Sequence, residues 1–140
     1  MKVKIKKLNK AVKLPTYANP GDAGLDLYSL EDYELKVGER HNFFNGFALE
    51  FPNGYVAIVK DKSGLPKNYG LHTMGGVFDA CYRGEYNVNL VNLGQEPHQI
   101  KAGDKIAQLL IIPCEHAEFE EAGELSETQR GEGRFGSSGR

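Results

Sequence analysis

The stretch Tyr86-Asn87-Val88-Asn89-Leu90 alternates large apolar residues with polar ones. A repeat of two residues is typical of a β-strand that buries one face. The same alternation recurs in three other short runs, which contain Val3 and Ile5, then Leu25 and Leu27, then Tyr33, Leu35 and Val37. Clusters of turn-forming residues such as Asn19-Pro20-Gly21 separate the runs. This spacing predicts an all-β fold in the form of a jelly-roll-like sandwich or barrel.

Residues 106–112 are apolar except for Gln108, which indicates a strand covered on both faces. A covered glutamine needs a hydrogen-bond partner, and one interpretation is a polar residue at the strand's end that bonds to backbone. Nowhere does the sequence have a convincing amphipathic helical period. Residues 65–69 could form at most one helical turn, which Pro66 near its start would suit.

The length and charge of the chain limit what it can do. Its 140 residues fit one domain, and a formal charge of −2 implies no general basic surface for nucleic acid or a membrane. The N-terminus is unlike a signal peptide, and no apolar run approaches the roughly 20 residues of a membrane span. We therefore expect a soluble, cytoplasmic protein. Cys81 and Cys114 are not in a CxxC arrangement and should be free thiols.

The end of the chain differs from the rest in composition. Residues 130–140 are rich in glycine and contain one apolar residue, Phe135. Such a segment cannot join a core, so we predict a β domain of residues 1–129 followed by a mobile arm of residues 130–140. A frayed terminus or a cloning scar would have the same composition. Arginines, exposed amides and one aromatic ring would also suit an arm that closes over an anionic ligand with a flat base.

Two segments have the residue types of a phosphate-cleaving site. Asp61-Lys62-Ser63-Gly64 combines a cation, a hydroxyl and a glycine whose amide can approach phosphate oxygens, although a surface turn would look alike. Residues 75–84 begin with paired glycines that would fit a hairpin lining a pocket. They contain Asp79, which could orient a water and accept its proton during attack on phosphorus. The alternative for Asp79 is a turn-capping aspartate.

The remaining acidic residues and the histidines suggest no metal held directly by protein. Asp22, Asp26 and Asp104 could each be ordinary turn aspartates. The histidines lack the spacing of a helical ligand pair. Magnesium bound mainly through substrate phosphates and water fits this composition better.

Taken together and in order, these segments resemble the five motifs of the trimeric dUTP pyrophosphatase (dUTPase) family. The matching segments are Ala23-Gly24-Leu25-Asp26-Leu27, Lys62-Ser63-Gly64-Leu65, Gly76-Val77-Phe78-Asp79-Ala80-Cys81-Tyr82-Arg83-Gly84, Gly103-Asp104-Lys105-Ile106-Ala107-Gln108-Leu109, and Arg130-Gly131 through Phe135-Gly136-Ser137-Ser138-Gly139. Their order, spread over nearly the whole chain, is what makes the resemblance specific.

The resemblance implies hydrolysis of dUTP to dUMP and pyrophosphate with Mg²⁺, an activity that supports dTTP synthesis and keeps uracil out of DNA. It also implies a jelly-roll-like homotrimer with three active sites, in which two subunits build each pocket and the third lends its arm. Asp79 would orient the water that attacks the α-phosphorus. Asp26 would act near the magnesium ion through water.

The same resemblance implies a set of substrate contacts. They are Lys62, Ser63, Gly64, Thr73, Val77, Phe78, Tyr82, Gln108, Arg130, Phe135, Gly136 and Ser137. Tyr82 would pack against the deoxyribose and Phe135 would stack over the uracil, while Arg130, Gly136 and Ser137 engage the γ-phosphate. The hairpin around residues 73–79 would read uracil largely through backbone groups, and its tightness would exclude the thymine methyl group.

The chain departs from the family pattern at three positions, and two rival functions remain. Lys62 stands where the family usually has arginine, which keeps the charge but loses the two-pronged grip on phosphate. Cys81 and Arg134 also replace more usual residues. A dCTP deaminase would share the fold and trimer, but the arm and the short chain argue against it. A non-catalytic nucleotide-binding trimer is the other rival, against which Asp79 and the intact arm argue.

Overall fold

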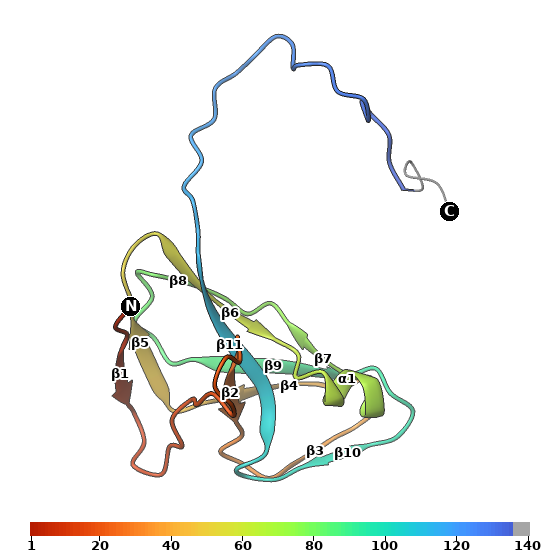
Figure 1. Ribbon diagram of the computed structural model, residues 1–140. Helices are drawn as coiled ribbons and strands as arrows, with labels where there is room; N and C mark the ends of the chain where they lie inside the picture. The colour runs from red at the N-terminus through yellow and green to blue at the C-terminus, as the bar shows by residue number, and fades with distance from the viewer. Residues whose placement is uncertain (136–140) are drawn as a thin grey trace.

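The computed structural model describes residues 1–135, and within them the chain forms eleven strands and one short helix (Figure 1). The elements in chain order are β1 (Lys4–Lys7), β2 (Leu25–Tyr28), β3 (Tyr33–Leu35), β4 (Arg40–Phe44), β5 (Phe47–Glu50), β6 (Tyr55–Lys60), α1 (Gly64–Tyr69), β7 (Leu71–Met74), β8 (Val77–Asp79), β9 (Asn87–Asn92), β10 (His98–Ile100) and β11 (Lys105–Pro113). The prediction of an all-β fold is confirmed.

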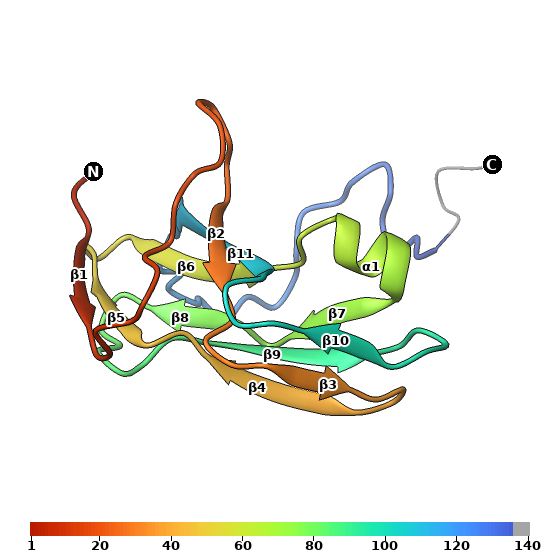
Figure 2. The ribbon, with the colours of Figure 1, turned by 90° about the horizontal axis from the view of Figure 1, so that it is seen from below.

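The strands of the described residues form four sheets, and all their pairings are antiparallel. The largest sheet has the order β2-β11-β6-β8, and a three-stranded sheet has the order β4-β9-β7. Two strand pairs, β1 with β5 and β10 with β3, complete the fold. Figure 2 shows β2, β11 and β6 on one side of the body and β4, β9 and β3 on the other.

The core lies between these layers and is supplied by the alternating strands. In β9, Val88 and Leu90 are buried while Asn89 between them is only partly covered, as the sequence predicted. The largest fully buried apolar side chains are Tyr86, Phe43, Phe47, Leu27, Leu35, Leu71, Leu90, Ile100, Ile106 and Leu109. Removing this apolar surface from water is the main force that holds the sheets together.

Strand β11 pairs with β2 on one side and β6 on the other, so its first half is interior. Ile106, Ala107 and Leu109 are buried, whereas Ile112 near its end is 38 % exposed. The prediction of a strand covered on both faces is therefore right for the first half and wrong for the end of β11 in the single chain. The apolar run continues past the edge of the core.

Helix α1 is the single helical turn that the sequence allowed, and none of its residues is buried. It ends at Gly70, which adopts a φ of 71° and donates its N–H to the carbonyl of Pro66. A left-handed residue at this position is a common way to end a helix, and glycine adopts it without steric cost.

After β11 the chain leaves the body (Figure 1). Residues 114–135 are all exposed and contain neither helix nor strand. That residues 130–140 act as an arm separate from a domain of residues 1–129 stays a prediction. The described residues contain no helix long and apolar enough to cross a membrane.

Candidate active site

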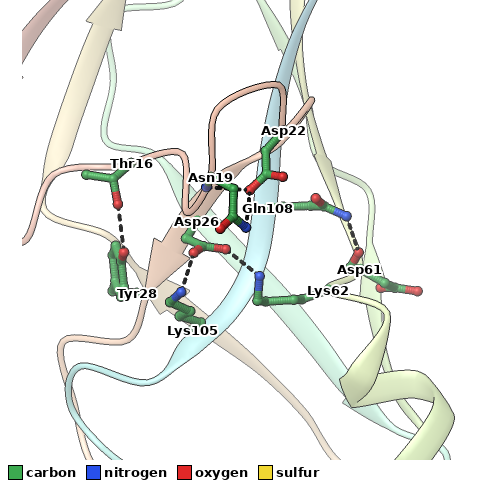
Figure 3. Close-up of polar contacts among 9 residues, drawn as sticks. All are labelled: Thr16, Asn19, Asp22, Asp26, Tyr28, Asp61, Lys62, Lys105 and Gln108. Carbon is green, nitrogen blue, oxygen red and sulfur yellow. Dashed lines mark hydrogen bonds and ion pairs between the residues drawn. The ribbon is translucent and has the colours of Figure 1, made fainter.

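The carboxylate of Asp26 on β2 lies between two lysines (Figure 3). Lys62 Nζ lies 2.6 Å from Oδ1, and Lys105 Nζ lies 2.6 Å from Oδ2. Asp26 is only 2 % exposed. Burial alone would raise the pKa of Asp26, but hydrogen bonds and charges from Lys105 and Lys62 outweigh it and hold that pKa below its usual value. Asp26 is therefore ionised at neutral pH, and the three groups together carry one net positive charge.

Asp26 differs in its surroundings from Asp22 and Asp104, the two other aspartates that could have been turn residues. Asp22 accepts the backbone N–H of Asn19, and Asp104 accepts that of Lys101, both across three residues. These two are turn aspartates, as one interpretation of the sequence held. Asp26 instead sits inside a sheet, opposite Gln108 on β11.

The Lys62-Ser63-Gly64 segment, called here the KSG segment (residues 62–64), leads from β6 into α1. Ser63 occupies the N-cap position, but its side chain makes no capping hydrogen bond. A side chain built on Gly64 would meet no atom within 4 Å, so the space beside its backbone is open. A free hydroxyl, an accessible backbone and the nearby Lys62 ammonium are groups that can surround a phosphate.

Gln108 has its hydrogen-bond partner in the backbone. Its Nε2 donates to the carbonyl of Asp61 at 2.8 Å (Figure 3). Its other face packs against Gly24, where any side-chain carbon would overlap the glutamine side chain. Gly24 is needed so that Gln108 can reach Asp61. A contact between Gln108 and phosphate stays a prediction.

Two residues of this region had no role assigned from the sequence. Lys105 is the second cation on Asp26, and Asp61 accepts the backbone N–H of Thr73 at 2.6 Å and pairs with His72 Nδ1 at 2.7 Å. Asp61 stands directly before the KSG segment, and Lys105 lies three residues before Gln108. Both lie close to assigned residues in the sequence, but their own contacts are with residues 11 or more positions away.

The glycine pair Gly75-Gly76, called here the glycine turn, is not the tip of a hairpin as the sequence suggested. Strand β7 before it pairs with β9, and strand β8 after it pairs with β6. The turn therefore carries the chain from the three-stranded sheet to the four-stranded one. Both glycines have positive φ, and Gly76 accepts the N–H of Val59 at 2.7 Å.

Asp79 ends β8, where its side chain is exposed. Its carbonyl accepts the N–H of Tyr82, which brings the tyrosine back over the strand. The Tyr82 ring is partly exposed and packs at a tilt on Phe78, with 5.7 Å between ring centroids. Val77 points outward and is 67 % exposed. Asp79 and Tyr82 are therefore both accessible, Asp79 as a carboxylate at the end of β8 and Tyr82 as a ring that packs on Phe78.

One chain does not bring Asp79 to the KSG segment. Asp79 lies opposite Val56 at the start of β6, whereas the KSG segment follows Lys60 at the end of the same strand. At the usual rise of a strand, Val56 and Lys60 are about 13 Å apart. The KSG segment leads into α1, and in Figure 2 the β8 arrow points away from α1.

The predicted contacts of the arm are also separate from the body. Arg130 donates from Nε to the carbonyl of Gly133, and the Phe135 ring is fully exposed. Gly136 and Ser137 lie outside the described residues. Cys81 and Cys114 are both free and exposed, as expected. Within residues 1–135 no group of three or more His, Cys, Asp or Glu side chains could hold a metal ion.

Comparisons with known proteins agree with this architecture. The dUTPase family model matches residues 10–139, which include all five motif segments. This chain belongs to the dUTPase family. Deoxyuridine 5'-triphosphate nucleotidohydrolase of Anaplasma marginale (strain St. Maries) is 45 % identical over 145 residues, with 99 % of each chain covered.

Solved structures of the dUTPase family share the fold. A mutant of the Staphylococcus bacteriophage 80alpha dUTPase with dUpNHpp matches with a TM-score of 0.90 and 28 % identity, covering 99 % of each chain. A mutant dUTPase from phage phi11 of S. aureus, whose structure describes a structural Mg(II) ion, matches with a TM-score of 0.82 and 25 % identity. That match covers 89 % of this chain and 98 % of the phage chain.

Proposed function

We propose that this chain hydrolyses dUTP to dUMP and pyrophosphate by attack of water on the α-phosphorus. The main support is the full-length identity of 45 % with a deoxyuridine 5'-triphosphate nucleotidohydrolase. The exposed carboxylate of Asp79 and the cationic KSG segment are the groups that this chemistry requires.

Asp79 acts as the general base. It orients a water molecule and takes its proton as the water oxygen bonds to the α-phosphorus. The bond from the α-phosphorus to the bridging oxygen breaks, and pyrophosphate leaves with the bonding electrons. The position of Asp79 at the end of a sheet-bound strand supports this role, because the backbone there is fixed while the carboxylate reaches solvent.

The KSG segment and Gln108 hold the phosphates. Lys62 turns from Asp26 to a phosphate oxygen, and Lys105 stays to neutralise the buried carboxylate. Ser63 and Gly64 donate from the hydroxyl and the backbone. The partial exposure of the Lys62 side chain, 35 %, supports its freedom to turn.

Mg²⁺ is the metal of the reaction, and the residues suit an ion held mainly by substrate phosphates and water. Mg²⁺ prefers oxygen ligands and keeps several waters. Asp26 is the carboxylate beside the KSG segment, and Lys62 would leave one of its oxygens open to the water shell. When bound, the ion offsets the charge of the triphosphate. The structural Mg(II) ion described for the phage phi11 protein supports magnesium only as a metal that this fold can bind.

The working unit is a homotrimer in which neighbouring chains share each site. Asp79 and the KSG segment lie at opposite ends of β6, so the base of one chain would meet the phosphate-binding groups of another. The exposed segment after Pro113 has the length to reach a neighbour, where Arg130, Phe135, Gly136 and Ser137 close over the nucleotide. The uracil ring of the substrate lies against Thr73, Val77 and Phe78, with Tyr82 under the deoxyribose.

A pyrophosphate-release assay across dUTP, dTTP, dCTP and UTP, with and without Mg²⁺, tests the proposal. We expect release from dUTP with Mg²⁺ and little from the others. Ammonia released from dCTP, without pyrophosphate from dUTP, would establish the deaminase instead. Asp79→Asn should abolish release while the protein still binds dUTP, and unchanged turnover would remove Asp79 as the base.

The arm has its own test. A chain truncated after residue 129 should keep its fold and trimeric mass but lose most pyrophosphate release. Full activity in the truncated chain would eliminate the closing-arm role.

A further inference from the structure

Asp61 joins two parts of the molecule that belong to different sheets. It follows β6 of the four-stranded sheet, and both of its carboxylate oxygens contact β7 of the three-stranded sheet. Oδ1 accepts the backbone N–H of Thr73 at 2.6 Å, and Oδ2 lies 2.7 Å from His72 Nδ1. A carboxylate that uses both oxygens on one strand fixes the position of that strand more firmly than a single contact would.

Strand β7 needs this contact because it is an edge strand. Its only strand partner in the three-stranded sheet is β9, where Thr73 lies opposite Leu90. The outward N–H groups of an edge strand have no neighbouring strand to bond. Thr73 is only 8 % exposed, so an unpaired N–H there would be costly, and Asp61 satisfies it.

The backbone of Asp61 is held as well. Its carbonyl accepts Gln108 Nε2 from β11, and the next residue is Lys62, which pairs with Asp26 (Figure 3). The start of the KSG segment is therefore tied to β11 and β2, and through the Asp61 carboxylate to β7. The glycine turn that follows β7 is also tied to β6, because the backbone N–H of Val59 on β6 donates to the carbonyl of Gly76.

Asp61 carries a negative charge in this position. Burial would raise its pKa, but the hydrogen bonds from Thr73 and His72 outweigh that effect and lower the pKa below its usual value. A charged acceptor makes a stronger hydrogen bond to Thr73 than a neutral one.

We infer that Asp61 is a positioning residue that holds the KSG segment and the glycine turn in fixed relation and so contributes to selection of uracil over thymine. The inference rests on the proposed function. Exclusion of a methyl group requires a wall that does not move, because a wall that yields turns a clash into a contact. Without the Asp61 carboxylate, the hydrogen bond that connects Thr73 of β7 to the end of β6 is lost. Strand β7 and the glycine turn are then held less firmly.

Two substitutions test this inference, with kcat and KM measured for dUTP and dTTP. Asp61→Ala removes both contacts, and we expect the ratio of kcat/KM for dUTP over dTTP to fall about 10-fold, mainly through a lower KM for dTTP, because a wall that yields admits the methyl group. Asp61→Asn keeps an acceptor for the Thr73 N–H, so the ratio should stay within about 2-fold of the original. Hydrogen exchange at the Thr73 amide should accelerate in the alanine variant and not in the asparagine variant.

Asp32 provides a matched control. It also accepts a backbone N–H, that of Ala102 at 2.8 Å, and pairs with a basic residue, Lys101, but it lies in the loop between β2 and β3 and contacts the turn between β10 and β11. Asp32→Ala should leave the selectivity ratio unchanged. A change in Asp32→Ala as large as that in Asp61→Ala would show a general effect of lost turn contacts and overturn the inference.

The remaining outcomes are also decisive. If the original protein releases pyrophosphate from dUTP but Asp61→Ala keeps both its KM for dTTP and its selectivity, Asp61 has no positioning role. If the original protein releases none from dUTP, the proposed function fails, and the inference fails with it. Should Asp61→Ala not fold, Asp61→Asn still decides, because a 10-fold loss of selectivity there would contradict a role based on the Thr73 hydrogen bond.

Discussion

Asp26 accepts the ammonium group of Lys62 at 2.6 Å, although the two residues are 36 positions apart in the sequence. The contact joins the first two family motifs and places a cation between a buried carboxylate and the start of α1. An unpaired carboxylate in such a site would be unfavourable. Because Lys105 contacts the other oxygen, Lys62 can leave Asp26 without leaving that charge unpaired.

Acid should weaken the protein through Asp26. Its pKa in the folded chain lies below the ordinary value of 3.8, so its contribution to the free energy of unfolding is present above about pH 3.8 and is lost as the pH falls through the lower, folded-state value. Asp61, whose pKa is also lowered, acts in the same direction. Urea unfolding between pH 7 and pH 2.5 measures the loss.

The variant Asp26→Asn separates the contribution of Asp26 to acid sensitivity from that of Asp61. At pH 7 it should unfold about 1–2 kcal/mol more easily, since two partly exposed lysines lose their shared partner but can turn toward water. Below pH 4 the difference from the original protein should shrink. Asp22→Asn, at an exposed turn, serves as the control and should match the original protein throughout. A difference for Asp26→Asn that stays constant with pH would contradict the assignment.

Replacing Tyr86 with phenylalanine should make the protein more stable. Its ring is buried and stacks on Phe78 and Phe47, but its hydroxyl has no hydrogen-bond partner among the described residues. Burial also raises the pKa of this hydroxyl to about 12. Tyr86→Phe keeps the stacking and removes a buried polar group, so the free energy of unfolding should rise by about 1 kcal/mol. A fall in thermal midpoint would mean that the hydroxyl is satisfied.

Gly24→Ala should reduce activity more than stability. A methyl group at this position would overlap the Gln108 side chain and push it away from the Asp61 carbonyl. The glutamine is flexible, so the fold should lose little, whereas phosphate binding should weaken and the KM for dUTP should rise. Gly123→Ala, where the added carbon meets nothing and φ, as at Gly24, is not positive, controls for backbone effects. A normal KM in Gly24→Ala would show that Gln108 has no role in phosphate binding.

Local patterns predicted the strands, because each alternating run buries one face wherever its sheet partner lies. The run around Val88 and Leu90 became β9, and the short turn with Pro66 became α1. The sheet partners could not be predicted in this way. Nothing between Met74 and Val77 indicates that the chain changes sheets there, since that depends on the pairing of β7 with β9 and of β8 with β6.

The residues of the candidate site could be proposed from the sequence in the same way. Asp79, Lys62 and Gln108 could be selected by motif order, and their chemistry follows from residue type. The roles of Lys105 and Asp61 depend on contacts with Asp26 and Thr73 across the fold. Such long-range partners have no local sequence signal, because either residue would look the same on an open surface.

Sharing of the site between chains can be tested by mixing two inactive variants. Asp79→Asn lacks the base, and Lys62→Met should lose most activity because the KSG segment then lacks its cation. If Asp79 of one chain works with Lys62 of its neighbour, trimers refolded from an equal mixture should recover about a quarter of the original activity, since one in four neighbouring pairs has both intact residues.

The control mixes Asp79→Asn with Asp79→Ala, and no pair in it has an intact base, so it should stay inactive. Recovery only in the first mixture would follow from the positions of Asp79 and the KSG segment at opposite ends of β6. If the first mixture also stays inactive while its trimers form normally, then both residues act within one chain. The chain would then have to bend β6 or move the KSG segment to bring them together, which the pairing of β6 with both β11 and β8 opposes.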